Sequence, residues 1–355
     1  YRMTFPIFRA IHLLEISEIS IHLLGGILMK FSKLVGGSSK VTRILFGSDF
    51  HGSEIVFRKF LSAAFQYKAN VLMVGGDVTG KAMIPIVKQG GGEYEGFLFG
   101  EREQASNEDE LEKLKKKISN VGFYPIVIEK DEAEAIENDP KMMSARFEAE
   151  MCERVRQWMR LADEKLTPAG MQLFFMAGND DLYSIDDAIA EFPKVYNPDM
   201  KRFELEGGYE VLGISNANMT PWACARDLEE DELAKRLDTL ADMVQTPEHA
   251  IVIIHVPPYE TPLDSCPDLD KNLKIITQGG QVVMKSAGSP SVKAFINKVQ
   301  PMLALHGHIH ESAGHTRIGR TLAINAGSEY AEGIMKAALI NLEGGKVKGH
   351  ILISG

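Results

Sequence analysis

Histidine and carboxylate side chains recur where short apolar segments of the sequence end. The residues at five such ends are Asp49 and His51, Asp77, Asn179, His255, and His308 and His310. Imidazole nitrogens and carboxylate or amide oxygens are ligands that borderline divalent metals accept. Because no cysteine stands among them, a structural zinc site is disfavoured. Seven protein ligands are too many for one catalytic ion with open positions, so the set predicts two ions sharing a carboxylate.

Each of these signals alone is weak. An Asp-x-His pair arises by chance, a Gly-Asp pair is also an ordinary turn, and a single histidine in an apolar strand is more often a core residue. The segment from His306 to His310 is more informative, because three histidines in five residues seldom arise for packing reasons. We expect His306 itself to be buried and hydrogen-bonded rather than metal-bound. The order of all five groups at strand ends carries the prediction.

The elements that must position these residues alternate between strands and helices. Strand patterns over residues 43–47 and 70–75 flank a helical pattern over 54–67. This alternation predicts right-handed crossovers and an α/β layer architecture. In such sheets, functional side chains collect at the carboxyl ends of strands. Further strands are predicted at residues 172–177, 210–214, 250–254, 302–305, 322–325, 335–341 and 347–353.

The chain divides into an extension, a main domain and an insertion. Residues 1–40 form a hydrophobic extension and linker, but no run of roughly 20 apolar residues lies there, which disfavours a membrane-spanning helix. We expect a packing or oligomerisation segment; a peripheral membrane contact and a translation start at Met29 are the alternatives. Residues 41–355 are predicted to be the catalytic domain, with an insertion or cap at about 90–167.

The composition indicates which binding partners and which cellular compartment to expect. With 39 Lys and Arg against 49 Asp and Glu, the formal net charge is −10, which disfavours nucleic acid as a partner. The three cysteines are few and widely spaced, which fits a reducing compartment, so we predict a cytoplasmic protein. A homo-oligomer is left open.

The ordered set resembles the calcineurin-like metallophosphoesterase superfamily, and most closely a group of archaeal and bacterial phosphoesterases. The motifs that carry the resemblance are Asp49-x-His51, Gly76-Asp77-x-x-Gly80, Gly178-Asn179, His255 and Gly307-His308-x-His310. The resemblance covers roughly residues 41–355 apart from the insertion. It implies a four-layer α-β-β-α sandwich of two mixed β-sheets, with a helical or α/β insertion.

The resemblance also implies a role for each ligand. Asp49, His51 and His310 would hold the first metal; Asn179, His255 and His308 would hold the second; Asp77 would bridge both. The ions would be manganese, iron, zinc, nickel or cobalt, with manganese favoured. All seven residues would then serve catalysis.

One position departs from the family pattern. Many members have a histidine after the Gly-Asn pair, where it contacts phosphoryl oxygens or protonates the leaving group, but this chain has Asp180. A carboxylate there would repel phosphate, so we hypothesise a site that relies on its metals and prefers phosphodiesters. The alternative is that Asp180 is an exposed turn residue or helix cap. Our candidates for substrate contact are Asp180 and Tyr259, which lies in a long connection over residues 256–291.

These observations predict a dinuclear metal-dependent phosphoesterase that acts on a small-molecule phosphate ester, more likely a phosphodiester than a monoester. The nucleophile would be a hydroxide that bridges the two metals. One alternative is a binding scaffold of the same fold that has lost catalysis. Two further alternatives keep the metal-dependent hydrolysis but act on another substrate: a nuclease, or a hydrolase of lipid-linked pyrophosphates.

Overall fold

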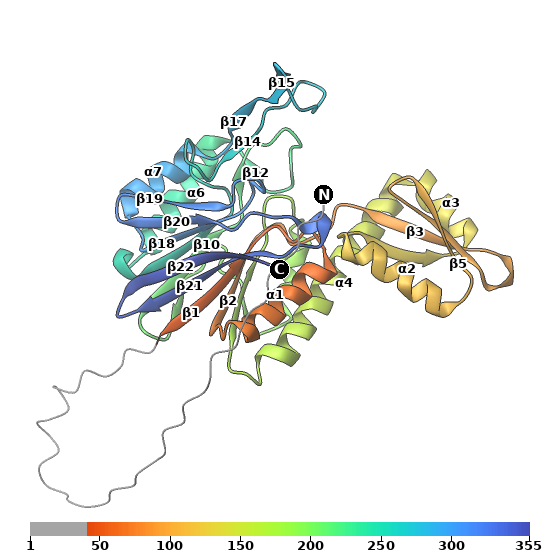
Figure 1. Cartoon of the computed structure of the whole chain (residues 1–355), viewed down its shortest axis with the longest axis horizontal. Helices are drawn as coiled ribbons and strands as arrows, with labels where there is room; N and C mark the ends of the chain where they lie inside the picture. The colour runs from red at the N-terminus through yellow and green to blue at the C-terminus, as the bar shows by residue number, and fades with distance from the viewer. Residues whose placement is uncertain (1–40) are drawn as a thin grey trace, which may run out of the picture. The chain divides into compact units, whose positions relative to one another are not determined.

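The computed structural model describes residues 41–355, so the predicted N-terminal extension lies outside the described residues. Two six-stranded mixed sheets pack face to face (Figure 1). The first sheet has the order β22 (Lys346–Ser354), β21 (Lys336–Glu343), β1 (Thr42–Gly47), β2 (Val71–Gly75), β7 (Gln172–Met176) and β8 (Val195–Tyr196). The second has the order β19 (Gly314–Ile318), β20 (Thr321–Asn325), β18 (Leu303–His306), β13 (Ala250–Ile254), β10 (Tyr209–Ile214) and β9 (Phe203–Leu205).

The central strands are apolar throughout because both of their faces are covered. In β1, Ile44 and Phe46 point into the core between the sheets, whereas Leu45 points into the core under the helices. This alternation follows from the two-residue repeat of a strand. β1, β2 and β7 pair in parallel, as do β10, β13, β18 and β20. The carboxyl ends of these parallel strands are therefore where polar side chains can gather.

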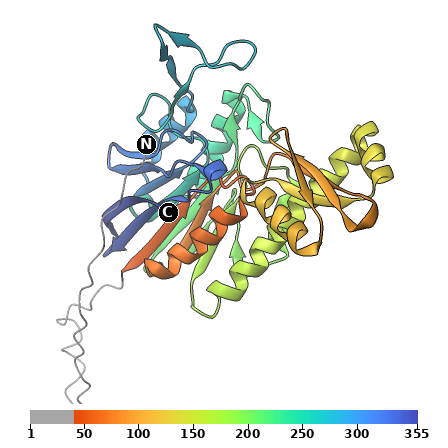
Figure 2. The same cartoon turned by 45° about the vertical axis from the view of Figure 1, so that its right-hand side comes forward.

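Helices cover the outer face of each sheet (Figure 2), which completes the predicted four-layer architecture. The first sheet is covered by α1 (Glu54–Gln66), α4 (Pro140–Leu166) and α5 (Ser184–Ala190). The second is covered by α6 (Glu230–Met243) and α7 (Pro290–Val299). Ser289 caps α7 by accepting a hydrogen bond from the amide of Val292 at 3.2 Å, which satisfies one otherwise unpaired donor.

The insertion contains a sheet of its own. Its strands are β5 (Glu101–Ala105), β4 (Tyr94–Leu98), β3 (Met83–Lys88) and β6 (Tyr124–Ile128), with the helices α2 (Glu108–Asn120) and α3 (Lys130–Asn138). The glycines of η1 (Gly90–Gly92) connect β3 to β4. The sheet of the insertion thus begins at Met83. The second half of α4 belongs to the main domain, because Met151, Val155 and Met159 pack into the main core.

Short pairs of strands decorate the loops of the second sheet. These are β11 (Ala217–Asn218) with β12 (Asp227–Leu228), β14 (Ser265–Pro267) with β17 (Met284–Ser286), and β15 (Thr277–Gln278) with β16 (Gln281–Val282). Two further 3₁₀ turns are η2 (Pro247–His249) and η3 (Tyr330–Glu332). Within residues 41–355, no helix combines the length and apolar character that crossing a membrane takes. The three cysteines are free.

Candidate metal centre

Loops that follow β1, β2, β7, β13 and β18 meet at one edge of the sandwich and bring the seven predicted ligands together. Four of these residues hold a left-handed backbone: φ is 57° at Asp49, 42° at His51, 49° at Asp77 and 68° at His308. Residues other than glycine seldom adopt this conformation. It costs on the order of 1–3 kcal/mol per residue, and such strain gathers at functional sites.

Backbone hydrogen bonds join the first two of these loops. The amide of Asp49 donates to the Gly76 carbonyl at 2.9 Å, and the amide of His51 donates to the Asp77 carbonyl at 2.9 Å. Close packing adds to this constraint at Gly307, where a Cβ would lie 2.3 Å from Asp49 Oδ2. A side chain at that position would displace the carboxylate.

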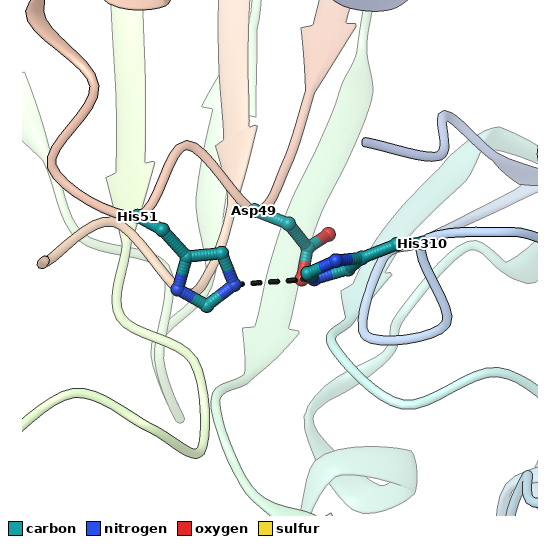
Figure 3. Close-up of side chains that lie close together, drawn as sticks. All are labelled: Asp49, His51 and His310. Atoms are coloured by element: carbon teal, nitrogen blue, oxygen red, sulfur yellow. Dashed lines mark hydrogen bonds and ion pairs between the residues drawn. The ribbon is translucent and has the colours of Figure 1, made fainter. Parts of the chain in front are cut away.

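Asp49, His51 and His310 form the first ligand group, and Figure 3 shows their side chains pointing toward one another. His51 Nε2 lies 3.1 Å from His310 Nε2, and His310 Nε2 lies 3.5 Å from Asp49 Oδ1. Two ligands about 2.1 Å from one ion lie roughly 3 Å apart when they are at a right angle. These spacings therefore suit a single first-row ion.

His255, His308 and Asp77 form the second ligand group. His255 Nε2 lies 3.3 Å from Asp77 Oδ1, and its other ring nitrogen, Nδ1, is 2.9 Å from the Gly75 carbonyl oxygen. Because that contact places the proton on Nδ1, the lone pair of neutral His255 is on Nε2 and faces the centre. Asn179 joins this group, since its Oδ1 lies 2.9 Å from His308 Nδ1.

Asp77 lies between the two groups. Its Oδ1 faces His255, while its Oδ2 is 3.8 Å from His51 Nε2. This placement is the one expected of a shared carboxylate. The predicted division of the seven residues thus matches their grouping in space, although their roles as ligands stay a prediction.

The electrostatics favour a cation in the centre. Burial lowers the pKa of His51 to about 3 and that of His308 to about 4, so both rings are neutral, the form that binds metal. Burial acts in the same direction on His255, but Asp77 overcomes it and raises the pKa of His255 to about 9. A carboxylate that attracts a proton so strongly would also attract a metal ion.

Buried imidazole nitrogens without a well-formed hydrogen bond indicate whether a metal ion fits between the ligand groups. His255 Nε2 and His51 Nδ1 are buried and make no well-formed hydrogen bond; the Asp77 oxygen 3.3 Å from His255 Nε2 is a charged contact. A buried polar atom without a partner costs about 1–3 kcal/mol, so a folded protein seldom keeps one without a reason. A metal ligand bond at His255 Nε2 removes that cost. The donor set of imidazoles, carboxylates and one amide oxygen fits a borderline divalent ion.

The sequence was compared with known protein families and with characterised and uncharacterised proteins. No family model matches the sequence. An uncharacterized protein of Methanocaldococcus jannaschii is 26% identical over 157 residues, which are 44% of this chain. The matched region is 63% of that relative's length.

Several solved structures are similar to the chain at low sequence identity. One matches with a TM-score of 0.52 at 15% identity, over 89% of this chain and 99% of its own. A dimetal phosphatase from Danio rerio has a TM-score of 0.39 at 8% identity and covers 88% and 98% of the two chains. A structure described as a novel archaeal phosphodiesterase has a TM-score of 0.31 at 11% identity and covers 88% and 100%.

The chain shares its fold with the first of these structures. The structure confirms the predicted fold class, because it has two mixed sheets with helices outside and the motif residues at the strand ends. Several residues that the sequence patterns did not single out support the site.

Asp227 orients Asn179. Asn179 Nδ2 donates to Asp227 Oδ1 at 2.7 Å, which leaves Asn179 Oδ1 facing His308. The other carboxylate oxygen of Asp227 accepts hydrogen bonds from Thr220 and from the amide of Cys224. Such partners typically improve metal affinity by fixing the orientation of the ligand.

Asp181 ties two ligand loops together. It is fully buried and accepts hydrogen bonds from the amides of Val78 at 3.0 Å, Thr79 at 2.8 Å and Gly178 at 2.7 Å, and from the Thr79 hydroxyl at 2.5 Å. Burial and the nearby Asp77 raise the pKa of Asp181 to about 6. The nearest helix, α5, receives no side-chain cap. Asp181 therefore joins the loops after β2 and β7.

Asp180 has a different environment from its neighbour. Its side chain is 28% exposed, and its Oδ2 lies 2.9 Å from Lys81 Nζ and 3.8 Å from His51 Nδ1. Lys81 therefore offsets the negative charge that would otherwise repel a phosphate. The Tyr330 ring lies 4.6 Å from the His51 ring, between centroids, and covers the same side of the centre.

Two other predictions concern residues near this site. Tyr259 is half-buried, and its amide donates to the Ser289 carbonyl at 3.1 Å. Within residues 41–355 it makes no hydrogen bond or ring contact with the seven ligands, so its substrate contact stays a prediction. His306 is buried, and its Nδ1 lies 2.8 Å from the Ile254 carbonyl oxygen, as expected.

Proposed function

We propose that the protein is a divalent-metal-dependent phosphoesterase with a dinuclear centre. The observation that carries the proposal is the convergence of seven suited ligands, with the buried Nε2 of His255 facing Asp77 Oδ1 without a well-formed hydrogen bond. Asp49, His51 and His310 would hold one ion, Asn179, His255 and His308 the other, and Asp77 would contact both. When bound, two such ions polarise a phosphoryl group and make a water molecule a better nucleophile near neutral pH.

The chain's own residues contribute positioning and charge. Asp181 and Asp227 fix the loops and the amide that present the ligands. Lys81 is the cation nearest to Asp180, and it can contact a phosphate oxygen at the edge of the site. Manganese is the favoured ion, and a small-molecule phosphate ester is the favoured substrate class.

A phosphodiester is the substrate that this site supports best. Asp180 stands at the position where a histidine would protonate the leaving group, and it is paired with Lys81. Without that general acid, esters with good leaving groups should react faster than alkyl monoesters. A preference for esters with good leaving groups, aryl phosphodiesters among them, is therefore the sharper part of the proposal.

The test is hydrolysis of bis-p-nitrophenyl phosphate against p-nitrophenyl phosphate, with chelated protein reloaded with Mn²⁺. We expect turnover of the diester to exceed that of the monoester. His308→Ala should abolish it, whereas His315→Ala, a change at an exposed histidine on β19, should not. Faster monoester turnover would refute the diester preference. No turnover of either ester, with the metal bound, would refute the proposed function.

A further inference from the structure

A cavity of 910 Å³ opens in the insertion, close to the candidate metal centre. Parts of β3, β4, β6, α3 and the first half of α4 line it. Its apolar lining includes Met83, Val87, Phe97, Ile128, Met143 and Phe147. The volume lies within the range of small-molecule sites, about 300–1,000 Å³, which are also mostly apolar.

The fold leaves apolar side chains in this cavity open to solvent. Phe97 is 58% exposed and Met143 is 42% exposed, in contrast to the buried methionines Met151 and Met159 in the second half of α4. Single exposed apolar residues need no explanation, but a cluster that lines one concave surface is typical of a binding site.

Lys81 belongs to both the cavity and the metal centre. It lines the cavity, and its Nζ lies 2.9 Å from Asp180 Oδ2, which in turn is 3.8 Å from His51 Nδ1. Tyr124 of β6 also joins the two regions. Its hydroxyl accepts a hydrogen bond from the amide of Gly80 at 2.6 Å, and its ring lies 5.7 Å from that of Phe147.

The charges of the lining indicate what kind of group fits. The charged lining residues are Lys81, Lys130, Glu95 and Glu134, two of each sign. The cavity thus has no net charge to hold a second anionic group such as a polyphosphate. An uncharged apolar group that extends from a phosphate held near Lys81 matches both the zero net charge of the cavity and its apolar lining.

We propose, building on the phosphoesterase function above, that this cavity binds the apolar organic group of the substrate. The protein would then act on amphiphilic phosphate esters. The phosphate would lie at the metal centre beside Lys81, and a hydrophobic chain would extend over Met143 and Phe97. The cavity thereby selects substrates by the size of their apolar group.

The test compares methyl and octyl p-nitrophenyl phosphate diesters, below the micelle concentration of the octyl compound, with the Mn²⁺-loaded full chain. Burial of each methylene favours binding, so we expect kcat/KM for the octyl ester to exceed that of the methyl ester at least tenfold. Met143→Asp should reduce this ratio at least fivefold. Met142→Asp is the matched control, because Met142 is 45% exposed on the same helix and does not line the cavity.

A binding measurement separates this proposal from the proposed function. Calorimetry of octylphosphonate and methylphosphonate on metal-free protein should show tighter binding of the octyl compound, and only Met143→Asp should weaken it. If both diesters are inert but this binding pattern holds, the cavity proposal stands and the phosphoesterase function fails. If the methyl diester turns over but the octyl group brings no gain in rate or binding, the cavity proposal is wrong. Equal losses in Met142→Asp and Met143→Asp would also overturn it.

Discussion

Replacing Asp181 should destabilise the fold far more than replacing its neighbour Asp180, although both residues are aspartates in one turn. Asp181→Ala removes the acceptor from three buried backbone amides, those of Val78, Thr79 and Gly178. Each unsatisfied donor costs about 1–3 kcal/mol, so the gross loss is about 3–9 kcal/mol.

Part of this loss is offset. The pKa of Asp181 is raised from 3.8 to about 6 by burial and by Asp77, which shows that the ionised carboxylate is held at a cost in the folded protein. A difference of that size corresponds to about 3 kcal/mol, and the alanine variant avoids this cost. The two figures leave a net loss of about 0–6 kcal/mol, so we expect the free energy of unfolding to fall by about 3 kcal/mol at pH 7, a large share of the roughly 5–15 kcal/mol typical of a domain.

Asp180→Ala is the matched control. Asp180 forms an ion pair with Lys81, whose side chain is 50% exposed. Exposed ion pairs of this kind contribute at most about 1 kcal/mol to stability. Urea unfolding of both variants and the unchanged protein, followed by circular dichroism in the presence of a chelator, measures the difference. If the two variants unfold at the same urea concentration, Asp181 does not hold the two ligand loops together.

Two further substitutions test how the ligands are held. Asp227→Ala frees the amide of Asn179 and should weaken Mn²⁺ binding by about 10- to 100-fold in a calorimetric titration, whereas an unchanged affinity would show that Asn179 needs no such partner. Gly307→Ala places a Cβ 2.3 Å from Asp49 Oδ2 and should lower both stability, by about 1–3 kcal/mol, and Mn²⁺ affinity. Gly349→Ala meets nothing within 4 Å and is its control; equal effects of the two glycine changes would contradict the packing argument.

The sequence was sufficient to predict the strands and the seven candidate ligands because both follow local rules. Buried parallel strands are continuous apolar runs, and the residues after their carboxyl ends share one edge of a sheet. The predicted strand over residues 43–47 and the helix over 54–67 correspond to β1 and α1 within one or two residues. His306 was also placed correctly, since it lies within an apolar strand.

The supporting residues could not be predicted because their contacts depend on tertiary structure. Asp227 lies 48 residues from Asn179, and Asp181 lies 103 residues from Val78. No periodicity or spacing joins these pairs. Likewise, nothing in the sequence indicates which of the adjacent residues Asp180 and Asp181 is buried, because the local turn decides it. Lys81 follows a glycine in a loop, so its ion pair with Asp180 emerges only from the folded chain.

The central claim is that the converging residues hold two divalent ions, and metal content tests it most directly. The chelated protein would be equilibrated with Mn²⁺, freed of unbound metal by gel filtration and analysed by mass spectrometry. We expect two ions per chain, no more than one in His308→Ala, and two in His315→Ala. Less than one ion in the unchanged protein, or full retention in His308→Ala, would contradict the assignment of this site.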